Sequence, residues 1–166
     1  MLYKLLETLD RHFPADRARA HCDIPCGIYD PRPAQIAALT VVRMVDLMQE
    51  MGSSGDTGSV EYMNSMTRYV LVKEEHAEKV KNEIRVIWGD YIKQQHIDKH
   101  PNLNELVHRI MQLGSKSRQT ADRDNAVQLV EAVNEFAEIF WETKGVSTKR
   151  VTAPYKPGLE VVSPEL

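Results

Sequence analysis

Residues 62–91 read YMNSMTRYVLVKEEHAEKVKNEIRVIWGDY and carry the longest regular pattern in the chain. Large apolar side chains recur there at steps of mostly three or four residues, the spacing that places them on one face of an α-helix. They are Tyr62, Met66, Tyr69, Val70, Val80, Ile84, Ile87, Trp88 and Tyr91. We therefore expect one long amphipathic helix here, the longest in the chain.

Three shorter stretches show the same spacing. One follows Asp30-Pro31, where aspartate can cap a helix and proline is favoured in its first turn. Another begins at His100-Pro101 and is predicted to end at residues 114–117. The last begins at Asp122, a favourable N-cap residue. The predicted buried faces are Ile36, Leu39, Val42, Val45 and Met48; Leu103, Leu106, Val107, Ile110 and Met111; and Ala126, Leu129, Val130, Val133, Phe136, Ala137 and Phe140.

Length and composition suit one helical domain. The chain has 166 residues, of which 42% are hydrophobic, enough for a helical core. Four amphipathic helices with short connections predict an all-α fold, with an antiparallel four-helix bundle over residues 32–144. No apolar run approaches membrane-spanning length. The net charge of −3, with signs interspersed, excludes the basic face of a nucleic-acid binder. We expect neither a membrane nor a nucleic acid as a partner.

Both ends of the chain depart from the bundle pattern. Residues 1–20 begin with helical spacing, but Lys4, Glu7 and Asp10 interrupt the apolar side chains, so this segment is not a secretory signal. The small, charged end of the segment is typical of an accessible cleavage site. Prolines and a glycine recur after residue 150, and we expect residues 145–166 to form an extended C-terminal arm.

Both cysteines lie in the short run HCDIPCGIYDP at residues 21–31. Two thiols beside an imidazole favour a late transition metal over magnesium or calcium. Pro25 and Gly27 oppose a helix and allow a turn that brings the sulfurs together. The spacing alone is also compatible with a disulfide, two inert thiols or half of a zinc site, although a structural zinc site would lack side-chain ligands here. The pair suits a reducing compartment, so we expect the cytoplasm.

The same run resembles the nickel-binding hook of the nickel superoxide dismutases, whose mature chain begins at the histidine of H-C-D-x-P-C-G-x-Y-D-P. Further matching runs are VLVKEE at 70–75, WGDYIK at 88–93, HPNL at 100–103 and IFWETK at 139–144. The resemblance implies an enzyme that converts superoxide into oxygen and hydrogen peroxide. It also implies a precursor in which residues 1–20 are a pro-segment removed on maturation and residues 21–31 are the hook.

This reaction needs a metal that takes an electron from one superoxide and gives it to the next. Thiolate and deprotonated amide donors stabilise Ni(III), so sulfur and backbone nitrogen belong together in such a site. The resemblance implies one nickel ion per subunit, and it implies the ligands position by position. Its ligands would be the thiolates of Cys22 and Cys26, the backbone nitrogen of Cys22, and the α-amine and imidazole of His21. Asp23 and Tyr29 would lie beside the metal, with the Tyr29 hydroxyl ordering the incoming anion or its water.

The resemblance extends to residues outside the hook. Lys93 follows the W-x-D-Y motif and is expected to attract the superoxide anion. A second lysine of the family falls near Lys116 or Arg118. The chain departs from the family where a glutamate and an arginine hold the axial imidazole, because Ala37 and His76 stand at those positions. The partner of the imidazole is therefore open, with His76 as one candidate.

The resemblance also implies a homohexamer, in which neighbouring bundles cover each hook, and a protease that cuts before His21. The alternative function is a nickel- or copper-binding carrier or sensor without turnover. A thiol-disulfide redox module is a third interpretation, weakened because the spacing is C-x3-C rather than C-x-x-C and no βαβ pattern follows.

Overall fold

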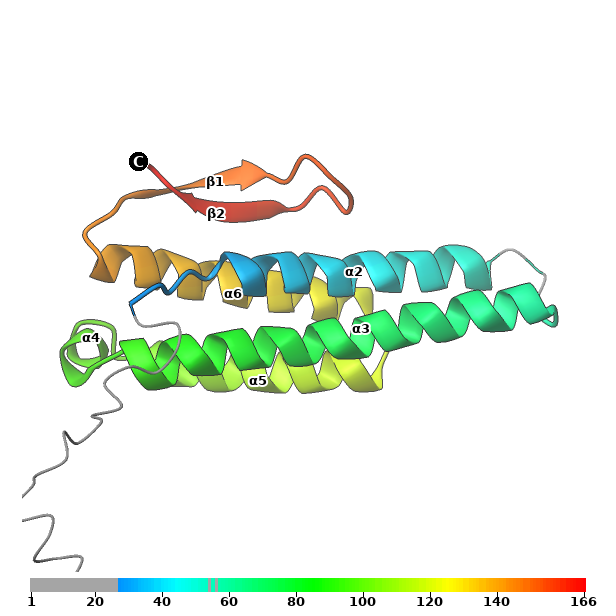
Figure 1. Ribbon diagram of the computed structural model, residues 1–166, viewed down its shortest axis with the longest axis horizontal. Helices are drawn as coiled ribbons and strands as arrows, with labels where there is room; N and C mark the ends of the chain where they lie inside the picture. The colour runs from blue at the N-terminus through cyan, green and yellow to red at the C-terminus, as the bar shows by residue number, and fades with distance from the viewer. Residues whose placement is uncertain (1–26, 54, 56) are drawn as a thin grey trace, which may run out of the picture.

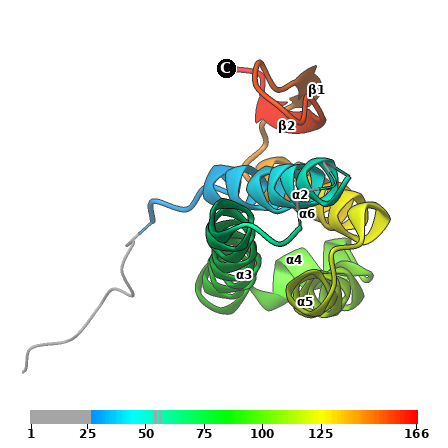
Figure 2. The ribbon, with the colours of Figure 1, turned by 90° about the vertical axis from the view of Figure 1, so that its right-hand side faces the viewer.

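The computed structural model describes residues 27–53, 55 and 57–166. Within them, a bundle is formed by helices α2 (Arg32–Gly52), α3 (Val60–Val86), α5 (Leu103–Gln119) and α6 (Arg123–Thr143). Successive helices of the bundle run in opposite directions (Figure 1), and the end-on view in Figure 2 shows them side by side around one core. The prediction of an all-α fold built on an antiparallel four-helix bundle is confirmed.

The core confirms the predicted faces of the last two helices and corrects the first two. The largest buried side chains include Phe136 and Phe140 of α6. In α2, Ile36 is exposed, because the buried face is turned towards small residues such as Ala34 and Ala38. In α3, burial is confined to the second half, and Val70, predicted to be buried, is exposed. The first half of α3 therefore presents an apolar face that its own bundle does not cover.

The long predicted helix ends in a change of helical type. α3 passes directly into the π-helix η1 (Ile87–Tyr91), closed by a hydrogen bond of 3.1 Å from the Ile92 nitrogen to the Ile87 carbonyl. A short helix, α4 (Gln94–Lys99), follows. It lies at the same end of the bundle as the start of α2 (Figure 1). The helical periodicity of the sequence indicated neither η1 nor α4.

The predicted helix end at residues 114–117 is wrong, because α5 continues through Gly114 to Gln119. A β-carbon at Gly114 would lie 3.0 Å from the Lys81 Cγ. The glycine therefore serves a close approach of α5 to α3 rather than a turn. The predicted cap at Asp122 is confirmed, because its carboxylate accepts the Asn125 N–H at 3.2 Å. At α2, Pro31 occupies the N-cap position and Asp30 accepts the Arg32 N–H at 2.7 Å.

The C-terminal residues form a hairpin on the outside of the bundle. Strand β1 (Thr148–Thr152) pairs antiparallel with β2 (Glu160–Pro164), and β2 buries Val161 and Val162. Figures 1 and 2 show the hairpin on the side of the bundle where α2 and α6 lie. None of the helices in the described part of the chain is long and apolar enough to cross a membrane.

A buried lysine joins α3 to the end of α5. Lys73 is only 2% exposed, and its ammonium donates to the carbonyls of Ser117 and Arg118 at 2.5 and 2.6 Å. These are carbonyls of the last helical turn, which have no partner inside the helix. Burial lowers the pKa of Lys73, and the neighbouring Glu74 carboxylate opposes this shift.

We expect Lys73→Met to lower the free energy of unfolding by about 1–3 kcal/mol, because two carbonyls lose their donor while the apolar stem is kept. The lowered pKa adds a pH dependence. Because the folded chain binds the Lys73 proton less tightly than the unfolded chain, wild-type stability rises with pH as the pH approaches the ordinary lysine pKa of about 10.4 from below.

Denaturant unfolding of both proteins across that range measures these effects. Lys73→Met should lack the rise with pH. Lys81→Met is the matched control, because Lys81 lies on the same helix and contacts the Ser115 hydroxyl at 3.2 Å. Equal losses in the two variants would show that the carbonyl contacts of Lys73 have no special weight.

Candidate functional site

The predicted site divides between residues that the structure describes and residues that it does not. His21, Cys22, Asp23 and Cys26 lie outside the described residues. Across 27–53, 55 and 57–166, no three His, Cys, Asp or Glu side chains gather so that they could hold a metal ion. The described part of the chain thus offers no rival to the ligands predicted from the sequence.

The first described residues lead from the hook to α2. Gly27 has a φ of +82°, a left-handed conformation that glycine adopts without a steric penalty. Ile28 is 80% exposed, whereas the next side chain, Tyr29, is half-buried and packs against the core. Tyr29 is therefore the first of the described residues to pack against the bundle.

The Tyr29 ring packs against Tyr91, the last residue of η1. The ring centroids are 5.5 Å apart and the planes are tilted by 42°. Tyr91 also contacts the His96 ring of α4, at 5.4 Å, and the Phe140 ring of α6, at 5.1 Å. These distances are in the favourable range for aromatic pairs. Tyr91 therefore joins four separate segments at one end of the bundle.

The orientation of Tyr91 is fixed by hydrogen bonding as well as by packing. Its hydroxyl oxygen lies 2.8 Å from Thr143 Oγ1, which in turn donates to the Phe140 carbonyl at 2.6 Å. Because a hydroxyl has one hydrogen to donate, Tyr91 is the donor to Thr143. The ring that supports Tyr29 is thus held at both its face and its hydroxyl.

Lys93 lies at the same end of the bundle. Its side chain is exposed, and its ammonium donates to the Asp90 carbonyl at 2.7 Å. Its backbone nitrogen donates to His96 Nδ1 at 3.1 Å, which ties Lys93 to the ring stacked on Tyr91. The structure thus connects Lys93 to Tyr29 through two aromatic side chains.

A second cation in this region was missed by the sequence analysis. The ammonium of Lys144 lies 4.6 Å from the centre of the Tyr91 ring and 5.2 Å from that of Phe140, within the range of a cation–π contact. Lys144 ends the matched run IFWETK and follows Phe140 by four residues, one helical turn. That spacing predicts its contact with Phe140, but nothing local predicts its contact with Tyr91.

The two other candidates for a second cation lie elsewhere in this chain. Lys116 pairs with Asp122 at 3.4 Å. Arg118 pairs with Glu74 at 2.9 Å and with Glu78 at 3.0 Å. Both belong to the last turn of α5, at the opposite end of that helix from η1 and α4 (Figure 1). The described chain does not bring them to Tyr29.

The two positions that depart from the family pattern are partly explained by their surroundings. Ala37 is only 1% exposed and belongs to the face that α2 packs into the core. His76 is half-buried, and its Nδ1 lies 2.8 Å from the Val72 carbonyl one turn earlier in α3. The imidazole of His76 is therefore oriented by its own helix.

An ion pair fastens α4 beside the aromatic cluster. The Lys99 ammonium lies 2.8 Å from the Glu142 carboxylate, and His100 Nε2 lies 3.8 Å from it. The hydrogen bond from Lys99 lowers the pKa of Glu142. Glu142 precedes Thr143, so this contact and the Tyr91 hydrogen bond meet at the end of α6.

Comparison with known proteins identifies the family. The model of a family described as nickel-containing superoxide dismutase matches residues 16–144. A protein of Streptomyces coelicolor named "Superoxide dismutase [Ni]" is 34% identical over 131 residues, covering 79% of this chain and 93% of the relative. One of Streptomyces seoulensis with the same name is 31% identical over 131 residues, with the same coverage.

A solved structure agrees. The native nickel superoxide dismutase structure at 1.30 Å is 33% identical, with a TM-score of 0.63 over 75% of this chain and 99% of that one. The matched region includes the whole HCDIPCGIYDP run and all four helices of the bundle. This chain therefore belongs to the nickel-containing superoxide dismutase family.

Proposed function

We propose that this protein disproportionates superoxide to oxygen and hydrogen peroxide at a nickel ion held by His21, Cys22 and Cys26. The observation that carries this function is the family match over residues 16–144, which contains the hook with every fixed letter of its pattern. The relatives in the comparison are named as dismutases. The alternative of a carrier or sensor without turnover has no such support.

The chemistry of the donors suits nickel. Two thiolates, an imidazole and nitrogen donors match the N/S preference of a tetragonal nickel site and do not suit magnesium or calcium. When bound, nickel supplies a one-electron couple that is reduced by one superoxide and reoxidised by the next. The protein provides anionic sulfur ligands and a free amine at His21. These donors make nickel easier to oxidise, so that superoxide can both reduce and reoxidise it.

Tyr29 contributes a fixed hydroxyl. Its ring packs at 5.5 Å on Tyr91, which is itself held by Phe140 and Thr143. A phenol held in this way can donate a hydrogen bond to an incoming anion or its water with little reorganisation. Asp23 is proposed as its neighbour from the family pattern alone.

Lys93 and Lys144 supply positive charge at this end of a chain whose net charge is −3. The Lys144 ammonium lies over the Tyr91 ring. The Lys93 ammonium donates to the Asp90 carbonyl in η1, and the Lys93 backbone nitrogen donates to the His96 ring that stacks on Tyr91. A local positive field raises the encounter rate of an anionic substrate by roughly 10- to 1,000-fold even where the net charge is unfavourable.

The proposed assembly is a homohexamer. Large apolar side chains are exposed on α3, among them Val60, Met63, Leu71 and Trp88 at its continuation in η1. We take these exposed apolar side chains as support for contacts with other chains. Exposed Ile28, next to the hook, supports the same proposal. We also propose that a cytoplasmic protease removes residues 1–20.

The first test is turnover by nickel-loaded protein with a free His21 terminus. It should remove superoxide catalytically, whereas Cys22→Ser and Cys26→Ser should each lose essentially all activity, because losing one thiolate makes nickel too hard to oxidise. Helical circular dichroism should stay unchanged in both variants and serves as the control. Substantial turnover in either variant would contradict the proposed ligands.

The second test concerns charge. Lys93→Glu should slow the reaction far more than Lys93→Gln, and Lys144→Glu should act in the same direction. The differences should shrink with added salt, as the screening length falls from about 10 Å at 0.1 M to about 3 Å at 1 M. Lys116→Glu makes the same change in net charge at the far end of α5 and is the matched control. Equal effects of Lys116→Glu and Lys144→Glu would show that Lys144 has no local role.

The third test concerns maturation. In the uncut chain the His21 nitrogen is an amide, and its use as a ligand would require a further deprotonation. Protein that begins at His21 should therefore gain nickel-thiolate absorption and activity, while a version with one extra N-terminal alanine should gain neither. The two proteins differ by one residue, so each controls for the folding of the other. Equal activity would rule out the free amine as a ligand.

A further inference from the structure

The hairpin of β1 and β2 is an addition to the shared part of the chain. The family match ends at residue 144, and β1 begins at Thr148. The hairpin nevertheless contacts the bundle through specific polar groups as well as through Val161 and Val162. These contacts indicate what the hairpin does for the site.

Two buried amides of the bundle bind the backbone of β2. Gln35 of α2 is 2% exposed and Asn134 of α6 is fully buried. Gln35 Nε2 donates to Asn134 Oδ1 at 3.0 Å and to the Val162 carbonyl at 3.1 Å. Asn134 Oδ1 also accepts the Val162 N–H at 3.2 Å, and Nδ2 donates to the Glu160 carbonyl at 2.9 Å. These buried polar groups thus depend on the hairpin for part of their hydrogen bonding.

A further contact reaches the first residue of α2. Arg32 Nη2 donates to the Ser163 hydroxyl at 2.5 Å, and the Arg32 backbone N–H donates to Asp30. Arg32 and Gln35 are three residues apart and lie on one side of the first turn. β2 therefore contacts the first turn of α2 at two points, directly after Tyr29 in the chain.

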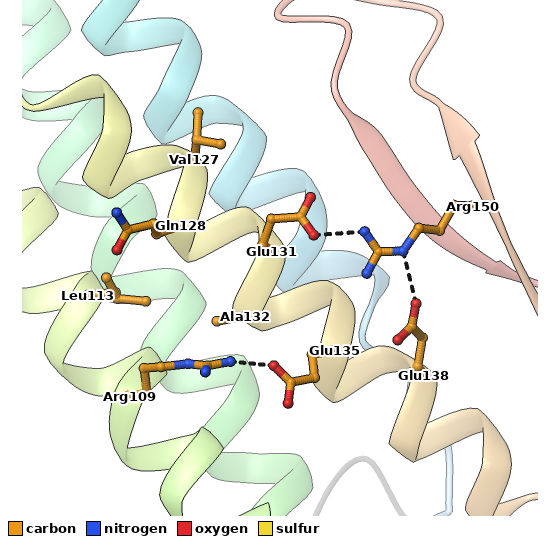
Figure 3. A pocket seen from close by; sticks show the side chains of 9 residues that line it. All are labelled: Arg109, Leu113, Val127, Gln128, Glu131, Ala132, Glu135, Glu138 and Arg150. Carbon is orange, nitrogen blue, oxygen red and sulfur yellow. Dashed lines mark hydrogen bonds and ion pairs between the residues drawn. The ribbon is translucent and has the colours of Figure 1, made fainter.

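Arg150 fastens the other strand to α6. Arg150 of β1 lies 2.7 Å from Glu131 and 3.0 Å from Glu138, as Figure 3 shows. These three residues line part of a groove of about 510 Å³ between α5, α6 and β1. Arg109 and Glu135 in the same groove also pair with each other. The ion pairs of Arg150 therefore hold β1 to α6, and the pair of Arg109 and Glu135 joins α5 to α6.

The first turn of α2 already buries Pro31 and Ala34 in the bundle, but the residues before it make fewer contacts. Ile28 is 80% exposed, Asp30 is exposed and Tyr29 is half-buried. Helix ends of this kind open locally at low cost in free energy unless side chains fasten them. A strand held to α6 on one side and bonded to Arg32 and Gln35 on the other supplies such a fastening.

We propose that the C-terminal hairpin positions the site by fixing the first turn of α2, with Arg32 and Ser163 as the positioning residues. β2, which Asn134 holds to α6, bonds to Gln35 and Arg32 of α2, and Tyr29 is thereby kept against Tyr91. This inference rests on the proposed role of Tyr29 in superoxide turnover. Neither residue touches substrate, and both act through the placement of Tyr29.

The first measurement is amide hydrogen exchange of the nickel-free protein. Arg32→Met keeps the apolar stem and removes the hydrogen bond, and Ser163→Ala removes its partner. Each should speed exchange over residues 29–36 by roughly tenfold, the effect expected for one hydrogen bond to a charged group. Exchange over residues 45–52, at the other end of α2, should not change. Arg32→Lys should restore part of the protection.

Arg150→Met is the matched control, because it also removes arginine contacts of the hairpin but only those to α6. Its ion pairs are largely exposed, and such pairs contribute about 0–1 kcal/mol each. It should therefore leave exchange over residues 29–36 within about twofold of wild type. Equal acceleration in Arg150→Met and Arg32→Met would overturn the proposal, since the hairpin would then act only as a general cover.

The second measurement uses nickel-loaded protein that begins at His21. Arg32→Met and Ser163→Ala should bind a full equivalent of nickel, yet turn over several-fold more slowly and give a broadened electron paramagnetic resonance signal of oxidised nickel. Faster exchange with unchanged turnover and resonance would overturn the positioning role. If wild-type protein failed to turn over superoxide, the proposed function would fall, and the exchange data would still decide whether β2 holds the first turn.

Discussion

The candidate site depends on the packing of a single ring, that of Tyr91. Tyr91 contacts Tyr29 from the segment before α2, His96 from α4, and Phe140 from α6, and its hydroxyl donates to Thr143. These segments are far apart in the sequence, and Tyr91 is the residue that all three of these ring contacts share. The ring links the core around Phe140 to Tyr29, in the segment that leads into α2.

The sequence predicted the buried side chains of a helix well where burial follows the local periodicity. It predicted them less well where burial depends on which other helix packs against that segment. The α6 face is buried as its spacing indicates, because one side of α6 meets the rest of the bundle along its length. α3 has an equally regular pattern, but its first half outruns the core, so Val70 stays exposed. Gly114 looked like a helix end and is instead a contact with Lys81. Local sequence cannot distinguish these two uses of glycine, because the neighbour is more than thirty residues away.

The residues of the site also differ in this way, because some are adjacent in the sequence and others are brought together only by the fold. The ligands of the hook stay a prediction that rests on the resemblance of residues 21–31 to the family pattern, because the spacing of the donors alone left a disulfide, inert thiols and half of a zinc site open. Lys144 and Tyr91 could not be assigned to the site from sequence, because their meeting is created by η1 and by the end of α6. The contacts of Gln35 and Asn134 with β2 were hidden for a similar reason. A buried amide inside an apolar stripe looks unfavourable until the strand that satisfies it is known.

The π-helix η1 has a consequence for how this fold tolerates changes in length. A residue in an α-helix advances about 100° around the axis, and a π-turn accommodates one residue more than an α-turn. The direction of the Tyr91 side chain is therefore set by counting residues from α3. Removing Gly89, which carries no side chain and lies in η1, would let α3 continue as a regular helix with Tyr91 facing nearly the same way, but a second deletion would rotate Tyr91 by about 100°, away from Phe140. Every residue with a chemical role would still be present, yet they would no longer meet.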